Sequence, residues 1–268
     1  MPTEVIMCGA GGRMGRRIMA LAIEQNAFSL LGAIERAESP LIGQDAGVVA
    51  GLDPIGVSIQ STLVAQAGQV VIDFSSLEAL PSVVQSTRSQ GAALVCGTTG
   101  LKEEQQKHLR EASKEIPVLY SPNMSVGVNL MFLLARQVAA WTGEEFDIEI
   151  VEAHHRFKRD APSGTAMRLA EMVAEGRGVK LEETARYARE GIMPERTQQE
   201  IGIQTLRGGD IVGEHTVFFC GMGERLELTH RATSRDIFAR GALRAAAWLQ
   251  HQPAGLYSMF DLLSFSNP

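Results

Sequence analysis

The stretch EAHHRFKRDAPSGTA, residues 152–166, holds the densest group of reactive side chains in the sequence. Two adjacent histidines, His154 and His155, precede a lysine, Lys158, within a run of charged residues. Imidazole exchanges protons near neutral pH, and a lysine ammonium group can donate a proton or bind an anion. The spacing therefore predicts a site that holds an anion beside groups able to transfer protons.

The Pro-Ser-Gly-Thr sequence that follows predicts the start of a helix. Ser163 is a typical N-cap, so Gly164 and Thr165 become the first helical residues and leave their backbone N–H groups free. Free N–H groups at a helix start attract carboxylates, and the nearby cations add positive potential. These features fit a small dianionic substrate that is protonated as it is reduced.

Each feature also has a structural alternative. A Ser-Gly-Thr helix start is often only a cap, adjacent histidines are often surface residues, and Asp160 can hold Lys158 or Arg156 rather than act. A metal site is not expected, because His154 and His155 would point to opposite faces of an extended strand and no third ligand lies nearby. The other histidines lack comparable neighbours and are expected to be structural: His108, His215, His230 and His251.

A glycine-rich loop, VIMCGAGGRMG at residues 5–15, is the second group of interest. Gly9, Gly12 and Gly15 are spaced one residue wider than the strict G-x-G-x-x-G fingerprint. Glycines there permit a tight strand-to-helix turn and let the backbone approach a pyrophosphate, which the helix N-terminus attracts. The loop predicts dinucleotide binding, with a plain glycine-rich turn as the alternative.

An acid and a cation end the next expected strand, LLGAIER. Glu35 lies 20 residues after Gly15, where an acid that binds the adenine ribose of NADH is expected. Arg36 suits the 2′-phosphate of NADPH. The pair predicts that both NADH and NADPH are used, and a surface ion pair is the alternative.

Two further loops follow expected strands, CGTTG at residues 96–100 and SPNMSVG at 121–127. In an open α/β sheet, ligands bind beyond the carboxyl ends of the strands, so small hydroxyl and amide groups there can reach ribose or nicotinamide. Cys96 raises a rival hypothesis, a thiol nucleophile. No matching signature surrounds Cys96, and it ends an apolar strand.

The elements that must position these residues form two patterns. Over the first 125 residues, short apolar strands alternate with amphipathic helices, which predicts an α/β fold with a Rossmann-type parallel sheet. After Pro122, consecutive strands joined by glycine-rich turns predict a second α+β domain on a mixed or antiparallel sheet. The strands expected are Glu4–Met7, Leu30–Ile34, Val70–Asp73, Ala93–Cys96, Pro117–Tyr120, Phe146–Ala153, Gln199–Leu206, Glu214–Cys220 and Glu224–Arg231, and the helices are Met14–Gln25, Leu77–Gln90, Glu103–Glu115, Ser125–Trp141, Gly164–Gly176 and Asp236–Gln250.

Composition and charge narrow the classes of protein to which this chain can belong. The chain has 268 residues, a formal net charge of −6 and a pI of about 5.6, which argues against nucleic acid and anionic membranes as partners. No apolar run approaches the roughly 18 residues of a membrane span, and no signal peptide is recognised. Three cysteines stand far apart, with Cys8 and Cys220 expected to be buried thiols. A reducing, cytoplasmic setting is expected.

In the order of its motifs, the whole sequence resembles the dihydrodipicolinate reductase family, also called 4-hydroxy-tetrahydrodipicolinate reductase. The motifs are GAGGRMG, DFSS, CGTTG, SPNMSVGVN, EAHHRFKRDAPSGTA, RGGDIVGEHTV and TSRDIFARGA. The resemblance implies an oxidoreductase of lysine and diaminopimelate biosynthesis that reduces a cyclic imine by hydride transfer from NADH or NADPH. It also implies a homotetramer formed through the sheet of the second domain, and closure about hinges near residues 123–127 and 235.

The resemblance also implies residue roles and domain limits. His154 and Lys158 would handle the catalytic proton, while His155, Gly164 and Thr165 would bind the substrate. Residues 1–125 with 236–268 would form the dinucleotide-binding domain, and residues 126–235 the substrate-binding and oligomerisation domain. The cofactor would contact Gly9, Ala10, Gly11, Gly12, Arg13, Met14, Glu35, Arg36, Gly97, Thr98, Thr99, Ser121, Pro122, Asn123 and Met124; at Met124 some relatives carry an aromatic residue.

Two rival functions remain at this point. Another nicotinamide enzyme, such as an amino-acid or hydroxy-acid dehydrogenase, would share the first domain but would not need the cluster at 152–166. A non-catalytic dinucleotide sensor would keep the glycine loop and Glu35 without needing Lys158.

Overall fold

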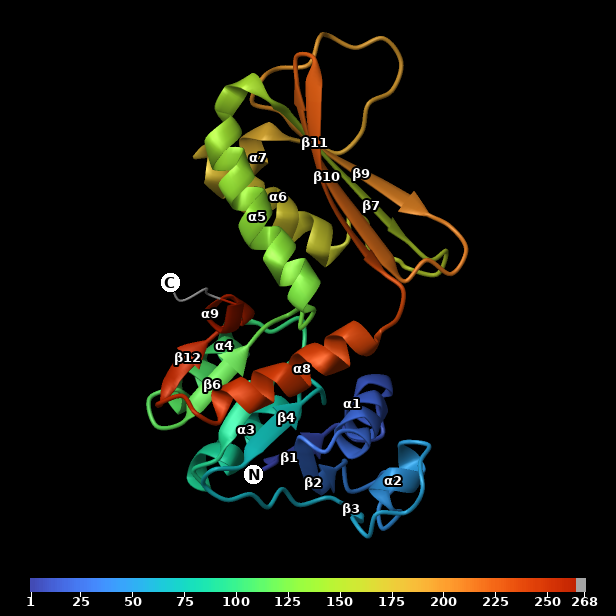
Figure 1. Ribbon diagram of the computed structural model, residues 1–268, viewed down its shortest axis with the longest axis vertical. Helices are drawn as coiled ribbons and strands as arrows, with labels where there is room; N and C mark the ends of the chain where they lie inside the picture. Colours follow the sequence, from blue (N-terminus) through green and yellow to red (C-terminus); the bar gives the residue numbers. More distant parts are fainter. Residues whose placement is uncertain (264–268) are drawn as a thin grey trace. The chain divides into compact units, whose positions relative to one another are not determined.

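The computed structural model describes residues 1–263, in which the chain divides into two compact units (Figure 1). The first unit comprises Met1–Val126 together with the chain from Asp236 onward, and the second is Gly127–Arg235. Within the described residues, no helix combines the length and apolar character that crossing a membrane requires.

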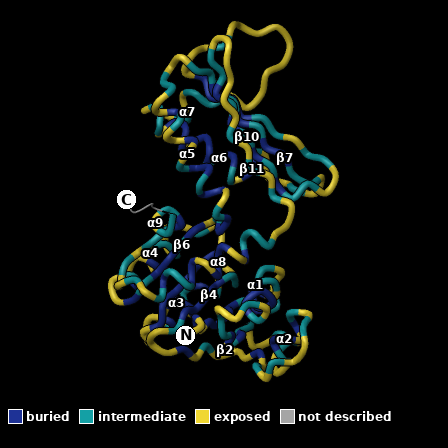
Figure 2. Tube along the Cα trace, in the orientation of Figure 1, coloured by how far each residue is buried: buried dark blue, intermediate teal, exposed yellow. Residues whose placement is uncertain are grey.

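The first unit is built on a seven-stranded sheet in which every strand pair is parallel. Its central strands VVID and ALVC are buried at every position because helices cover both faces. Figure 2 shows the dark blue, buried chain at β4. This confirms the predicted Rossmann-type sheet. The strand order is β12-β6-β5-β4-β1-β2-β3, with bounds β1 Thr3–Cys8, β2 Phe28–Ile34, β3 Ile59–Gln60, β4 Val70–Asp73, β5 Ala93–Cys96, β6 Pro117–Tyr120 and β12 Gly255–Tyr257.

The two faces of this sheet carry separate apolar cores. One core joins helices α1 and α8 to the sheet, and the other joins α3 and α4. At the start of α8, Asp236 accepts two hydrogen bonds of 2.6 and 2.7 Å from the Arg17 guanidinium of α1, which fastens α8 to α1 within the first unit. The helices are α1 Arg13–Glu24, α2 Ala46–Val49, α3 Leu80–Ser89, α4 Glu103–Ala112, α8 Asp236–Leu249 and α9 Met259–Leu263.

The second unit carries a five-stranded mixed sheet in the order β11-β10-β7-β9-β8. The β7–β10 and β10–β11 pairs are antiparallel, whereas β7–β9 and β8–β9 are parallel. This confirms the predicted second α+β unit. Its elements are α5 Val126–Thr142, η1 Gly143–Glu145, β7 Asp147–His154, α6 Gly164–Arg177, α7 Leu181–Thr184, β8 Ala185–Arg186, β9 Ile201–Arg207, β10 Gly213–Gly221 and β11 Glu224–Ala232.

One face of the mixed sheet packs against α6, and α5 lies on the same side of the sheet (Figure 1). Along β10, His215, Val217 and Phe219 are buried on that face, and the residues between them are half-buried. The expectation that Cys220 is a buried thiol is wrong, because its position falls on the alternate face of β10, where it is half-buried. Cys8 is buried as expected.

Two other expectations need correction. Helix α3 begins at Leu80 rather than Leu77, because Pro81 fits only the first turn of a helix. Between residues 37 and 60, where no helix was expected, the chain forms the single turn α2, whose N-cap Asp45 accepts hydrogen bonds from the Gly47 and Val48 N–H groups.

Candidate active site

The predicted cofactor residues gather at the carboxyl edge of the parallel sheet. Strand register places Cys8, Asp73, Cys96 and Tyr120 side by side on four adjacent strands. Four segments therefore leave the sheet side by side at this edge: the glycine loop, the Phe74–Ser75 turn, the CGTTG loop and the SPNMSVG loop. Side chains from distant parts of the sequence meet there within one unit.

The glycine loop is closely packed at its first and third glycines. Gly9 has a positive φ of 80° and faces the next strand end so tightly that a Cβ would lie 2.6 Å from the Phe74 carbonyl oxygen. A Cβ on Gly15 would lie 2.1 Å from the Gly9 carbonyl oxygen, so α1 can approach the loop only with glycine there. Any larger side chain at either position would displace backbone.

The start of α1 fits an anionic group. Its N-cap is Gly12, which offers no side-chain acceptor to the first N–H groups, and the first turn holds no acidic residue. Unpaired N–H groups and the positive end of the helix dipole favour a phosphate. The residues of this loop thus fit the pyrophosphate of a dinucleotide.

Glu35, at the end of β2, already contacts the glycine loop. Its Oε1 accepts a hydrogen bond of 2.8 Å from the Gly11 backbone N–H, and its Oε2 accepts one of 3.2 Å from the Arg36 N–H. In the part of the chain that the structure describes, no ion pair joins Glu35 to the Arg36 guanidinium. The surface ion pair considered as an alternative is therefore absent from the described residues.

A buried carboxylate, Asp73, organises the next two loops. It accepts hydrogen bonds from the hydroxyls of Ser75 (2.6 Å) and Thr98 (2.7 Å). Burial raises the pKa of Asp73, and these hydrogen bonds oppose the rise. Gly97 lies against the Phe74 ring, where a Cβ would come within 2.2 Å of Cζ. The CGTTG loop is thus fixed to the neighbouring turn by one carboxylate and one aromatic ring.

Burial also raises the pKa of the Cys96 thiol, with a further contribution from the charge of Asp73. A thiol with a raised pKa remains protonated at neutral pH and is a poor nucleophile. The hypothesis of a catalytic Cys96 is therefore not supported.

The SPNMSVG loop is held by its own side chains. Ser121 donates a hydrogen bond of 2.7 Å to the Asn123 carbonyl oxygen, and the Ser125 N–H donates one of 2.9 Å to the Asn123 side chain. Met124 is buried in the core that includes α8, whereas Pro122 is exposed. The loop therefore presents Pro122 and part of Asn123, not the Met124 side chain, to solvent.

The charged motif begins on the helix-covered face of the mixed sheet. Glu152 and His154 are two residues apart on β7, so they share a face. Register places His215 of β10 and Thr205 of β9 opposite Glu152, and Arg207 of β9 opposite His154. Two adjacent rows of the sheet therefore form one polar cluster.

Glu152 is the centre of this cluster and is fully buried. Its carboxylate accepts two hydrogen bonds from Arg207, of 2.8 and 2.9 Å, and contacts His154 Nδ1 at 2.6 Å. The Ser163 N–H at the start of α6 donates a further bond of 2.9 Å. The carboxylate thus joins β7, β9 and the helix start.

Ser163 caps α6 as predicted, its Oγ accepting a hydrogen bond from the Ala166 N–H. The same Oγ lies 3.2 Å from Nε2 of His215, whose ring meets the His154 ring edge to face at 5.2 Å. Gly164 is exposed and Thr165 is half-buried in the first turn. The helix start is therefore anchored by Ser163 and leaves Gly164 accessible.

Lys158 and His155 lie on the loop after β7. Lys158 Nζ pairs with Asp160 at 2.8 Å. This is one of the structural alternatives considered from the sequence, in which Asp160 holds Lys158. The loop is braced because the Lys158 N–H donates to the His155 carbonyl oxygen and the Arg156 N–H donates to that of Gly209. Nδ1 of His155 is buried without a hydrogen-bond partner among the described residues.

The imidazoles of the cluster favour their neutral forms. Burial lowers the pKa of His154, and the Glu152 carboxylate opposes this change while Lys158 and Arg207 add to it. Burial lowers the pKa of His215 to about 3. The pKa of Glu152 is also lowered, because its hydrogen bonds from Arg207, His154 and Ser163 outweigh its desolvation.

Sequence reasoning did not identify four residues that organise the two sites: Glu152, Arg207 and His215 in the polar cluster, and Asp73 beside the cofactor loops. His215 was expected to be structural because its sequence neighbours are not comparable to those of the charged motif; in the structure it contacts both Ser163 and His154 of that motif. The period-2 relation of Glu152 to His154 was a usable signal. The contributions of Arg207 and His215 depend on strand register. Among residues 1–263, no group of three His, Cys, Asp or Glu side chains is arranged to hold a metal.

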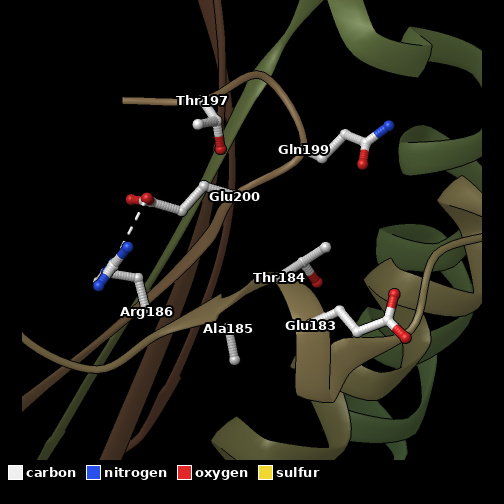
Figure 3. Close-up of a pocket in the computed structure, with 7 residues that line it drawn as sticks. All are labelled: Glu183, Thr184, Ala185, Arg186, Thr197, Gln199 and Glu200. Atoms are coloured by element: carbon white, nitrogen blue, oxygen red, sulfur yellow. Dashed lines mark hydrogen bonds and ion pairs between the residues drawn. The ribbon is translucent and has the colours of Figure 1, made fainter. Parts of the chain in front are cut away.

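A separate polar pocket lies in the second unit between the short strand β8 and the start of β9 (Figure 3). Arg186 and Glu200 form an ion pair of 3.4 Å across it, and Glu183 is a second carboxylate in its lining. No residue predicted for catalysis or binding lines this pocket. Its carboxylates oppose a negatively charged ligand.

The parallel sheet with its glycine loop, joined in sequence to a mixed-sheet unit bearing the charged cluster, defines a two-unit oxidoreductase of the nucleotide-binding class. Residues 3–124 match the family described as Dihydrodipicolinate reductase, N-terminus, and residues 127–263 match Dihydrodipicolinate reductase, C-terminus. The chain belongs to the dihydrodipicolinate reductase family, which confirms the family expected from its motifs.

Individual relatives agree with this assignment. The chain is 54% identical over 263 residues to the 4-hydroxy-tetrahydrodipicolinate reductase of Anaeromyxobacter dehalogenans (strain 2CP-1 / ATCC BAA-258), covering 97% of each chain. It is 50% identical over 262 residues to that of Citrifermentans bemidjiense, covering 97% of this chain and 98% of that one. A dipicolinate-bound dihydrodipicolinate reductase from Paenisporosarcina sp. TG-14 shares the fold, with a TM-score of 0.70, 20% identity, and coverage of 97% and 99%.

Proposed function

We propose that this protein catalyses the NAD(P)H-dependent reduction of 4-hydroxy-tetrahydrodipicolinate to tetrahydrodipicolinate in lysine and diaminopimelate biosynthesis. The observation that carries the proposal is the 54% identity, over 97% of both chains, to a protein of that name. The pair of buried Glu152 and half-buried His154, in the motif that holds Lys158 and leads into α6, supports it, because a proton-transferring site is what the reaction needs.

The cofactor is assigned to the carboxyl edge of the parallel sheet. The N–H groups in the first turn of α1, after Gly12, would bind the pyrophosphate, Glu35 the adenine ribose of NADH, and Arg36 the 2′-phosphate of NADPH. The loops fixed by Asp73 would line the nicotinamide side. The proposed cofactor contacts are Gly9, Ala10, Gly11, Gly12, Arg13, Met14, Glu35, Arg36, Gly97, Thr98, Thr99, Ser121, Pro122, Asn123 and Met124.

The substrate is assigned to the turn after His154. Gly164 and Thr165, in the first turn of α6, offer N–H groups and a hydroxyl to one carboxylate. His155 would contact the same molecule, and its unpartnered Nδ1 supports that role. The dipicolinate bound by the Paenisporosarcina relative is a planar dicarboxylate, which agrees with a site built for two negative charges.

The 4-hydroxy form must lose water, which leaves an unsaturated ring, and this ring must then gain a hydride and a proton. A bound nicotinamide would supply the hydride. His154 and Lys158 are the proposed proton-transferring residues, because an imidazole and an ammonium group can both exchange protons and both belong to the motif that leads into α6. Positioned acid–base groups contribute about 10²–10⁴-fold to rate. Lys158 would release Asp160 to donate its proton, and Glu152 would hold the His154 ring.

The assay is NAD(P)H absorbance with the product of the preceding synthase supplied. Consumption of both cofactors with that substrate supports the proposal, and the absence of turnover overturns it. Binding of pyridine-2,6-dicarboxylate together with NADH separates the rivals, since neither a dinucleotide sensor nor an unrelated dehydrogenase requires a dicarboxylate site. Turnover of an amino acid or hydroxy acid instead would favour the dehydrogenase.

A homotetramer is part of the proposal. The mixed sheet carries α5 and α6 on one face, and on the other face Val151, Thr216 and Phe218 are half-buried while Leu206 is exposed. A second copy covering this face would bury apolar area. Light scattering should give four copies per particle, and Phe218→Arg should reduce that number.

Three free cysteines are consistent with the proposed cytoplasmic location.

A further inference from the structure

The hydrogen-bond donors around Glu152 determine which ring nitrogen of His154 carries the proton. Besides the contact with His154, the carboxylate accepts four hydrogen bonds from three groups: two from the Arg207 guanidinium, one from the Ser163 N–H and one from the Thr205 hydroxyl. An ionised carboxylate only accepts hydrogen bonds. The 2.6 Å contact with His154 therefore requires a proton on Nδ1.

The other ring nitrogen of His154, Nε2, remains available for proton transfer. With Nδ1 protonated, a neutral imidazole carries a lone pair on Nε2. Gly213 of β10 makes room for this atom, because a Cβ at that position would lie 3.0 Å from Nε2. A glycine at this point thus keeps the Nε2 side of the ring open.

We propose that Glu152, held by the Arg207 fork, is a positioning residue that fixes His154 as its Nδ1–H tautomer and presents Nε2 as the proton-accepting and proton-donating atom. Glu152 itself touches neither substrate nor cofactor in this assignment. The inference deepens the proposed function and rests on it for the role of His154, but the tautomer is a property of the protein alone.

The charges that face His154 come from every strand and loop packed against it. Among the described residues whose charges act on His154, Glu152 on β7 is the carboxylate, whereas Lys158 on the loop and Arg207 on β9 are cations. His215 on β10 lies edge to face with the ring. Removing the Glu152 charge would leave only groups that disfavour an imidazolium, so His154 would bind a proton only at lower pH.

The decisive substitution is Glu152→Gln. Oε1 receives the Ser163, Thr205 and one Arg207 bond, so the glutamine oxygen must occupy that side. Its NH₂ group then replaces Oε2 and faces His154 Nδ1. A donor there favours the opposite tautomer, with the proton on Nε2.

Nitrogen-15 NMR of histidine-labelled protein without ligands reads the tautomer directly. At a pH where His154 is neutral, the wild type should give a protonated Nδ1 and a bare Nε2, and E152Q should give the reverse. Glu149→Gln is the matched control, since Glu149 lies on β7 and pairs with Arg189 and Arg196 rather than with the cluster. That variant should keep the wild-type His154 signals.

Kinetics provide the second readout. E152Q should lower kcat about 10²-fold, leave the KM for NADH within about twofold, and move the His154 limb of the pH profile to lower pH. Glu152→Asp, which keeps the charge, should recover part of the loss. E149Q should behave like the wild type.

The outcomes separate this inference from the proposed function. A wild-type His154 protonated on Nε2 when neutral overturns the inference, whether or not any variant folds. Wild-type turnover with an E152Q that matches it in kcat and pH profile also overturns it. If the wild type shows no reductase turnover but the Nδ1–H tautomer is present, the proposed function fails while the positioning by Glu152 stands.

Discussion

The buried carboxylate of Asp73 and the hydroxyl of Thr98 are joined by a hydrogen bond of 2.7 Å across 25 residues of sequence. Asp73 ends β4 and Thr98 opens the loop after β5, so this bond fixes one proposed cofactor loop to the next strand. The Ser75 hydroxyl binds the other carboxylate oxygen at 2.6 Å. A single side chain therefore sets the geometry of two loops.

We expect Asp73→Ala to weaken NADH binding about tenfold, or about 1.4 kcal/mol, because the buried Thr98 and half-buried Ser75 hydroxyls lose their acceptor and the loop is released. Asp73→Asn should bind NADH nearly as the wild type does, since its amide can accept from Ser75 and the Thr98 hydroxyl can turn to accept. Fluorescence titration with NADH measures both. Equal affinity of D73A and wild type would show that the loop is held by other contacts.

Lys158→Ala should lower kcat about 10²-fold or more while leaving the dissociation constant of NADH within about twofold. The reason is that Lys158 lies beside the proposed proton-transfer site on β7, in the unit that does not hold the cofactor loops. Steady-state kinetics and NADH titration separate the two effects. Lys180→Ala, which breaks an exposed pair with Glu183, is the control. Unchanged turnover in K158A would reject the catalytic role.

Thr165→Val should chiefly raise the KM for the substrate, about tenfold, since a carboxylate-binding hydroxyl is replaced by a methyl group of similar size. Binding of pyridine-2,6-dicarboxylate, measured by calorimetry, should weaken in parallel. Thr184→Val, in the short helix α7, serves as a comparison at a position outside the proposed site. A T165V enzyme with wild-type KM and dicarboxylate affinity would remove Thr165 from the site.

Arg36→Ala should raise the KM for NADPH about tenfold and change that for NADH little, because only NADPH carries the 2′-phosphate. Glu35 would still be available to the ribose, its carboxylate being held at the Gly11 N–H. Parallel kinetics with the two cofactors test this. A wild-type preference above about a hundredfold, roughly 3 kcal/mol, would contradict the predicted use of both.

His215 should make the folded protein sensitive to acid. Its pKa is lowered to about 3 by burial, whereas in the unfolded chain it is about 6.5. The unfolded state therefore binds more protons in this window, so the stability contributed by neutral His215 is present above about pH 6.5 and is lost as pH falls toward 3.

Between pH 7 and 4.5, the free energy of unfolding of His215→Gln should fall by about 2–3 kcal/mol less than that of the wild type, at about 1.4 kcal/mol per pKa unit. Urea unfolding at a series of pH values measures the slopes. His108→Gln, at an exposed position on α4, should keep the wild-type slope. Parallel pH dependences of H215Q and wild type would mean that His215 titrates normally in the folded state.

The sequence by itself determined the local elements and the residue types of both sites. Strands such as Val70–Asp73 and Ala93–Cys96 were predictable to the residue, because apolar runs bounded by polar turns have only one way to pair in a covered parallel sheet. The N-cap Ser163 was equally predictable, since capping depends on the few residues around it. The motifs were enough to identify the family.

Only the tertiary structure decided which distant groups meet. Arg207 lies 55 residues from Glu152, and His215 lies 52 residues from Ser163. Both contacts depend on the register of β9 and β10 against β7, and a shift of one residue would turn each side chain to the opposite face. Register is set by the packing of the whole sheet on α6, which no local stretch of sequence encodes.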